Sequence, residues 1–416
     1  MTAGPAARLK RPLAHRGATA ALSTLWRRGI LPEPTFEPAR LLADATRNTG
    51  LDDFGTEDGW RRPFLLLLED LAGPARLNPL GRAMAYGQVR KILCDRLRAV
   101  ALWRRHPEIL EHTLAPPVVI VGQARSGTTR LQRLLACDRM FLGSRFHEVF
   151  SPIPPRRGPD LRVMQARLAL AAIHAFNPRL QHIHPTGARM PEEQFGLFSF
   201  SFYGAQLEAQ WHLPRFAEWW RSADRHWVYE EFRRLMQTIG WSRGDDAERP
   251  WLLKAPQFME DLDPLLAVFP KSRLLCLHRE PADVVASSAS LGWNQMTVQS
   301  DAVDPHRVGR IWLAKTADRA AAARRALYRH EVPRLDLDYA GVAADWRGAV
   351  QRIYAFLGRP VTADTERRMK HYLTAAKRQG FDRHRYALED FGLDAAAVAA
   401  QIFPEEHDRH GAAAVS

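Results

Sequence analysis

The chain has little cysteine and no long apolar segment. Three of its 416 residues are cysteine (Cys94, Cys137 and Cys276), and their spacing matches no metal-binding motif. Three cysteines cannot staple so large a fold with disulfides, so we expect a reducing compartment and a cytoplasmic protein. No apolar run approaches the roughly 20 residues that cross a bilayer, so we expect no integral membrane segment.

Lysine is also scarce, although the chain is strongly basic. Seven of the 59 basic residues are lysine, and the formal net charge is +13. Such a charge attracts anionic partners, although genome base composition alone can produce an arginine-rich chain. The sequence carries no zinc-finger, RRM or basic-zipper signature, so we expect no nucleic-acid partner. A nucleotide or a sulfated small molecule fits the charge equally well.

Acidic residues are absent from residues 1–32. The same stretch contains six basic residues, Arg8, Lys10, Arg11, Arg16, Arg27 and Arg28. It could be a transit peptide. We favour a solvated basic arm that leads into a first helix over residues 18–28.

Hydrophobic periodicity divides the remaining chain. Residues 40–112 show helical spacing, with breaks expected at Pro63, Pro74 and Pro79. Short apolar runs at 118–121, 273–277 and 333–337 predict buried strands, with helical patterns between them. We therefore predict an α/β, P-loop-like three-layer fold, with a central parallel sheet flanked by helices and a helical N-terminal extension. The expected parts are 1–114, 115–400 and 401–416.

The first predicted strand runs into a glycine-containing loop and then a helix. Its glycines have the GxxxxG spacing of a nucleotide-binding loop, but Thr128-Thr129 replaces the usual Lys-Ser/Thr. Backbone N–H groups and a helix dipole directed at one spot form an anion site. The residues expected to build it are Gly122, Arg125, Ser126, Gly127, Thr128 and Thr129.

Two further segments place polar residues at strand ends. Arg279 follows the strand at 273–277, and Ser287 lies eight residues later in the helix expected after Pro281. Lys254 ends another apolar run. Ligands of open α/β sheets bind outside the carboxyl ends of the strands, so we expect the three segments to converge there.

These motifs, in this order, resemble the sulfotransferase superfamily, which uses 3′-phosphoadenylyl sulfate (PAPS) as sulfuryl donor. The Arg-Ser-Gly-Thr-Thr loop is similar to the family's 5′-phosphosulfate loop, and Arg279 and Ser287 have the spacing of its 3′-phosphate motif. The resemblance covers about residues 115–395 and adds Arg130, Tyr339 and Arg385 to the donor-binding residues that it implies.

The sequence departs from the cytosolic branch at two positions. Arg130 stands where those enzymes carry an adenine-stacking tryptophan, and Pro256 replaces the histidine of their Lys-Thr-His segment. The segment around Lys254 instead resembles tyrosylprotein sulfotransferases and bacterial relatives. That branch keeps a glutamate base at the spacing of Glu148, and His184 is the alternative base.

The resemblance implies an in-line displacement in which the protein positions the reactants and neutralises charge. Arg125 and Lys254 would stabilise the leaving group, and Glu148 would accept the proton of the acceptor hydroxyl. No metal is expected; His182 and His184 form an H-x-H pair without a third ligand.

The acceptor is the least specified part of the prediction. Ten aromatic residues within 195–227 either form core or line an apolar pocket, so we expect a lipid, sterol, polyketide or phenolic hydroxyl. Glu192 and Glu193 either cap a helix or contact the acceptor.

Two other functions remain as alternatives to sulfuryl transfer. One is a P-loop small-molecule or nucleoside kinase, which would need a loop lysine and a Mg²⁺-binding carboxylate. The other is a non-enzymatic nucleic-acid-binding protein.

Overall fold

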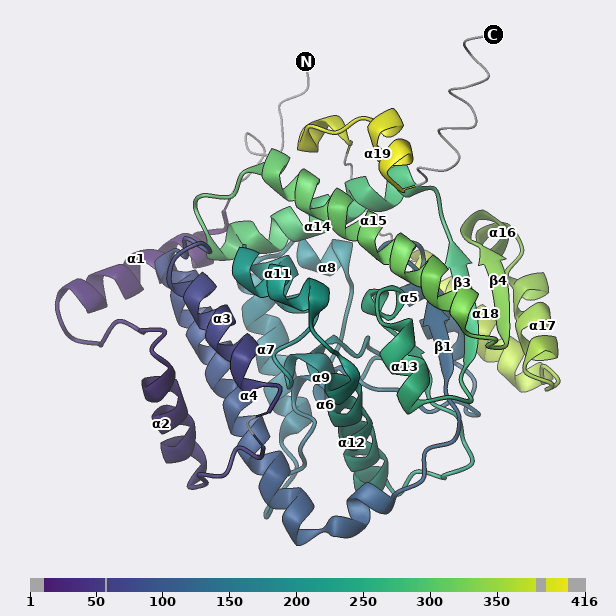
Figure 1. The fold of residues 1–416 in the computed structure, drawn as a ribbon, viewed down its shortest axis with the longest axis horizontal. Helices are drawn as coiled ribbons and strands as arrows, with labels where there is room; N and C mark the ends of the chain where they lie inside the picture. The colour runs from purple at the N-terminus through teal and green to yellow at the C-terminus, as the bar shows by residue number, and fades with distance from the viewer. Residues whose placement is uncertain (1–10, 57, 379–386, 403–416) are drawn as a thin grey trace.

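The computed structural model describes residues 11–56, 58–378 and 387–402. Its sheet has four parallel strands in the order β2-β1-β3-β4 (Figure 1). The strands are β1 (Val118–Val121), β2 (Leu252–Lys254), β3 (Arg273–His278) and β4 (Arg334–Asp338). All three predicted strands are confirmed, and the apolar run that ends at Lys254 supplies the fourth.

Helices precede the sheet and cover both of its faces. Before β1 lie α1 (Leu13–Arg27), α2 (Pro38–Thr49), α3 (Arg61–Ala72), α4 (Pro79–Arg105) and the 3₁₀ turn η2 (Pro107–Glu111). Between β1 and β2 lie α5 (Thr128–Leu135), α6 (Phe146–Phe150), α7 (Arg162–Phe176), α8 (Leu180–Ile183), α9 (Phe195–Ser199), α10 (Ala205–Gln210), α11 (Pro214–Ser222) and α12 (His226–Arg243). The rest are η3 (Pro256–Met259), α13 (Leu262–Val268), α14 (Pro281–Gln299), α15 (Pro305–Arg329), α16 (Tyr339–Ala344), α17 (Trp346–Phe356), α18 (Ala363–Arg378), η4 (Glu389–Phe391) and α19 (Ala395–Ile402).

The residues of β1 alternate between two apolar cores. Val118 and Ile120 pack with α5, α17 and α18, whereas Val119 and Val121 face a larger core built with α4, α9 and α12. Because helices cover both faces, every residue of the strand is buried. The expected α/β architecture with a helical N-terminal region is confirmed.

The N-terminal helices pack into the larger of these cores. Phe64 of α3 and Leu93 of α4 are buried in the same cluster as Val119 and Leu253 of the sheet. The helix break predicted at Pro63 is wrong, because Pro63 lies in the first turn of α3, where a missing N–H leaves no hydrogen bond unmade. The breaks at Pro74 and Pro79 are confirmed, since Pro74 lies between helices and Pro79 begins α4.

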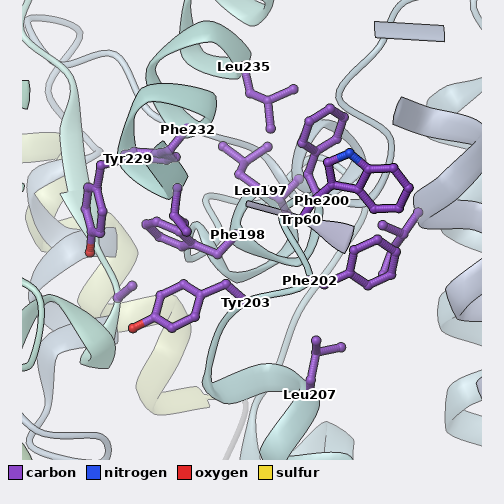
Figure 2. Close-up of a cluster of buried hydrophobic side chains, with 14 of the residues drawn as sticks. Trp60, Leu197, Phe198, Phe200, Phe202, Tyr203, Leu207, Tyr229, Phe232 and Leu235 are labelled. Atoms are coloured by element: carbon purple, nitrogen blue, oxygen red, sulfur yellow. The ribbon is translucent and has the colours of Figure 1, made fainter. Parts of the chain in front are cut away.

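Most aromatic residues of 195–227 belong to this core. Seven of the ten are buried, and Figure 2 shows four of them, Phe198, Phe200, Phe202 and Tyr203, packed with Trp60 and with Tyr229 and Phe232 of α12. The Tyr203 and Tyr229 hydroxyls donate hydrogen bonds of 2.6 and 3.1 Å to Asp261 Oδ2. These rings therefore stabilise the fold rather than line an open pocket.

The strand order puts a switch point of the topology between β1 and β3. From β1 the chain passes to β2 on one side of the sheet, whereas from β3 it passes to β4 on the other. Loops that leave neighbouring strands in opposite directions open a ligand-binding crevice at the carboxyl edge. This constraint places the loop after β1 beside the loop after β3.

None of the helices in the described parts of the chain combines the length and apolarity needed to cross a bilayer.

A close contact between α14 and α15 gives the first prediction. A Cβ added at Gly292 would lie 2.2 Å from Nε1 of the buried Trp312. Gly292→Ala should therefore lower the free energy of unfolding by about 1–3 kcal/mol, measured by urea denaturation. Gly87→Ala in α4 is the control, because nothing lies within 4 Å of its added Cβ. Equal stability of the two variants would contradict the proposed tight packing.

Candidate active site at the carboxyl edge of the sheet

The loop between β1 and α5 has a strained, closely packed backbone. Arg125 adopts φ 68° and Gly127 adopts φ 87°, both in the left-handed region. A Cβ at Gly127 would lie 2.4 Å from the Tyr339 ring, and one at Gly122 would lie 2.8 Å from the Leu277 carbonyl oxygen. Only glycine fits at these two positions, so the loop can approach the end of β3.

Arg125 and Arg279 join the loop to the elements that follow β3. Arg125 Nε donates to Ser287 Oγ of α14 at 3.0 Å, and Arg279 Nη1 donates to the Arg125 carbonyl oxygen at 2.7 Å. The Arg279 guanidinium also lies over the Tyr339 ring, 4.7 Å from its centroid. The structure thus brings together four residues that the sequence analysis assigned to one site.

Lys254, Thr129 and Glu193 form a second cluster at the end of β2. Lys254 Nζ lies 3.2 Å from Thr129 Oγ1 and forms an ion pair with Glu193. Thr129 Oγ1 donates to Glu193 Oε1 at 2.8 Å. Burial lowers the pKa of the Lys254 ammonium below its ordinary value, and Glu193 partly offsets that effect.

Gln194 fixes this cluster to the sheet. Its Oε1 accepts a hydrogen bond from the Lys254 backbone N–H at 2.7 Å, and its Nε2 donates to Ser144 Oγ at 2.8 Å. Ser144 Oγ in turn donates to the Glu192 carbonyl oxygen at 2.8 Å. The segment that carries Glu192 and Glu193 is therefore held against the end of β2.

His184 pairs with Glu192 beside this cluster. His184 Nε2 lies 3.1 Å from Glu192 Oε1, Thr186 Oγ1 donates to Glu192 Oε2 at 2.5 Å, and Arg125 Nη1 donates to the carbonyl oxygen of Ile183 at 3.1 Å. Burial alone would raise the pKa of the Glu192 carboxyl, but His184, Thr186 and the Glu193 amide outweigh it and hold the pKa at about 2.

His184, Glu192 and Glu193 could also hold a cation, because their ligand atoms lie within 4.8 Å of one another. In this structure the Lys254 ammonium forms an ion pair with Glu193, and His184 Nε2 lies within hydrogen-bond distance of Glu192 Oε1.

Glu148 lies apart from these clusters. Its carboxylate forms an ion pair with Arg243, whose Nε donates to Glu148 Oε1 at 2.7 Å, and its Oε2 accepts from the Arg145 amide at 2.7 Å. These contacts cap the short helix α6. Glu148 thus contacts Arg243 and the Arg145 amide, whereas Lys254 and Thr129 both contact Glu193.

The other predicted residues lie in or near the loop, with one outside the description. Ser126 is buried in the loop and Thr128 is buried at the start of α5, and Ser126 Oγ donates to the Gln123 carbonyl oxygen at 2.7 Å. Arg130 is exposed on α5. Arg385 lies outside the described residues.

Sequence reasoning assigned no definite role to Glu193 and did not single out Gln194. The signal that could have found them is a Glu-Glu-Gln run in an otherwise apolar segment.

Comparisons with known proteins agree with this geometry. The profile described as "Sulfotransferase family" matches residues 116–364. The fold is similar to the crystal structure of sulfotransferase STF1 from Mycobacterium tuberculosis H37Rv, with 28% sequence identity and a TM-score of 0.77, over 88% of this chain and 98% of that chain. Sulfotransferase STF9 from Mycobacterium avium is also similar, at 25% identity and a TM-score of 0.79, over 91% of this chain and 97% of that chain. A search of curated proteins finds no match.

The chain belongs to the sulfotransferase family. It is a sulfotransferase enzyme, whose family implies a PAPS donor. The family assignment favours sulfuryl transfer over the kinase and the nucleic-acid-binding alternatives.

The low pKa of Glu192 gives a pH-dependent prediction. Because its folded pKa of about 2 lies below the ordinary value of 4.5, the carboxylate stabilises the fold above about pH 4.5, and this contribution is lost as the pH falls towards 2. The free energy of unfolding of wild type should therefore be higher than that of Glu192→Gln at neutral pH, and this difference should become smaller near about pH 3. Urea denaturation at both pH values measures the difference. A difference that stays constant would contradict the assignment.

Proposed function

We propose that the enzyme transfers a sulfuryl group from PAPS to a hydroxyl of a small apolar or aromatic acceptor. One observation carries the proposal: the carboxyl edge of the sheet carries basic side chains in two clusters, with Lys254 beside Thr129 in one and Arg279 beside Arg125 in the other. The donor has two anionic ends, a phosphosulfate and a 3′-phosphate. Two separate basic clusters match that distribution of charge.

The residues present fit this donor. Gly122 and Gly127 let the loop pack closely against Leu277 and Tyr339, and the N-terminus of α5 would add its dipole to an anion site there. We assign the phosphosulfate end to the loop residues Arg125 to Thr129 and to Lys254. Arg279 and Ser287 would hold the 3′-phosphate. When bound, PAPS supplies an activated sulfuryl group with a phosphate leaving group.

The main role proposed for Lys254 and the loop after β1 is to neutralise negative charge on the donor. Lys254 and Arg125 would stabilise the negative charge that grows on the leaving oxygen, and the amides after Arg125 would bind the non-bridging oxygens. Burial of Lys254 strengthens this effect, because its charge acts in a medium of low polarizability. No metal is part of the proposal, so transfer should continue in the presence of EDTA.

Glu193 is the base that the contacts favour. The two side chains assigned to the transferred group, Lys254 and Thr129, both contact its carboxylate. A carboxylate adjacent to that group can accept the proton of an attacking hydroxyl, whereas the Glu148 carboxylate is engaged by Arg243. His184 stays the second candidate for the base, because it contacts Glu192, the residue next to Glu193 in the chain.

The proposed acceptor is an apolar molecule that carries a hydroxyl group. The buried aromatic cluster of 198–220 leaves less support for an aromatic pocket than the sequence suggested. We therefore keep the acceptor class and assign no further chemistry to it.

Donor binding tests the proposed function. Arg279→Ala should weaken the affinity for adenosine 3′,5′-bisphosphate by at least about 30-fold, since truncating one member of a buried charge pair costs roughly 2–5 kcal/mol. Arg273→Ala is the matched control, because it removes the same charge at the opposite end of β3. Calorimetry gives both dissociation constants. Unchanged binding in Arg279→Ala, or preferential binding of ATP–Mg²⁺, would refute the donor assignment.

The base is tested by three single variants. Glu193→Gln should slow the chemical step by at least about 100-fold, because the amide cannot accept the proton, while bisphosphate affinity changes little. Glu148→Gln is the control, since it also breaks a buried pair of a carboxylate with a cation. Single-turnover kinetics with PAPS measure the step. A severe loss in Glu148→Gln or in His184→Gln, with Glu193→Gln still active, would move the role to that residue.

A further inference from the structure

The basic N-terminal arm is folded and anchored to the body of the enzyme. We define the arm as residues 11–32, which contain α1 and the turn after it. His15 Nε2 donates to the Val298 carbonyl oxygen at 2.7 Å, and Arg11 Nη2 donates to that of Ser300 at 3.0 Å. Figure 1 shows α1 projecting from the edge of the molecule, and it packs against α4 and α7. The arm therefore has a defined structure and an outward face.

The arm exposes apolar side chains to an unusual degree. Leu13 is 81% exposed, Ile30 60% and Leu31 45%. Among the described residues, eight large apolar side chains are exposed, and six of them lie on the arm or at the start of α7. Three of the six are Leu161, which directly precedes α7, and Met164 and Leu168 of α7. Because α1 packs against α7, exposed apolar side chains on both elements belong to neighbouring parts of the surface, and this favours an interaction surface over scattered exposure.

The charges of the arm are of one sign. Arg16, Arg27 and Arg28 are exposed, and residues 1–32 contain no aspartate or glutamate. The arm thus combines apolar side chains with exposed guanidinium groups, and none of its charges is negative. Interfacial helices have this combination, because apolar groups enter the acyl boundary while cations meet lipid phosphates.

We propose that the arm and the start of α7 dock the enzyme onto an anionic lipid surface. Charge favours this occupant over a second copy of the chain, since each copy carries a formal net charge of +13 and repels another basic arm. Anionic headgroups attract the same arginines and leave Leu13, Ile30 and Leu31 free to insert. The inference does not depend on the proposed donor or acceptor, because it concerns binding to lipid alone.

Co-sedimentation with vesicles tests the proposal. Wild type should bind mixed phosphatidylcholine–phosphatidylglycerol vesicles at least about 10-fold more than pure phosphatidylcholine vesicles, and added salt should weaken the binding. One variant combines Arg16→Glu, Arg27→Glu and Arg28→Glu, and another combines Leu13→Ser, Ile30→Ser and Leu31→Ser. Both should lose most of the binding. Unchanged affinity for adenosine 3′,5′-bisphosphate shows that each variant is folded.

A charge-matched control separates the arm from the general basicity of the protein. Arg325→Glu, Arg352→Glu and Arg359→Glu together change the net charge by the same amount at exposed positions on other elements. This variant should keep the vesicle binding. The proposal fails if the control loses as much binding as the arm variants, or if wild type does not bind. It also fails if light scattering reveals a dimer that the serine variant dissociates, while neither protein binds vesicles.

Discussion

A lysine buried at the end of a central strand governs the arrangement of the site. Lys254 is 2% exposed, and a buried ammonium is costly unless a carboxylate and hydrogen-bond partners surround it. Glu193 and Thr129 meet that requirement from two other elements. Gln194 must then hold its segment against β2. The need to neutralise one buried charge thus determines where the chain between α8 and α9 can run.

The sheet is subject to a second constraint: its interior must stay apolar, while charged side chains must lie at its carboxyl edge. Both faces of β1 are covered, so its residues are fully buried, and polar side chains are possible only where the strand ends. The change of direction between β1 and β3 then brings the side chains at the ends of both strands to one place on that edge. The helices before β1 contribute to the same arrangement, because their apolar residues form part of the larger of the two cores that cover the sheet.

The sequence predicted the elements with strong local signals. The β-branched run at 118–121 and the glycine loop after it identify β1 and α5, and Arg279 could be placed because it directly follows a strand. Glu148 shows that spacing in the sequence does not predict the tertiary contacts of a side chain. Its spacing resembled that of a family base, but tertiary packing paired it with Arg243, which lies 95 residues away in sequence. The contact of Glu193 with Lys254 could not be predicted for the same reason, since no local pattern tells which carboxylate a distant lysine will meet.

The hydrogen bond from Arg279 to the carbonyl oxygen of Arg125 has a consequence for the energetics of the crevice. It links the backbone of one anion-binding loop directly to the side chain of the other. A change at either arginine therefore perturbs both regions, so their mutational effects on affinity cannot be additive. Through this contact, fixing the position of one segment would remove part of the entropy loss of fixing the other.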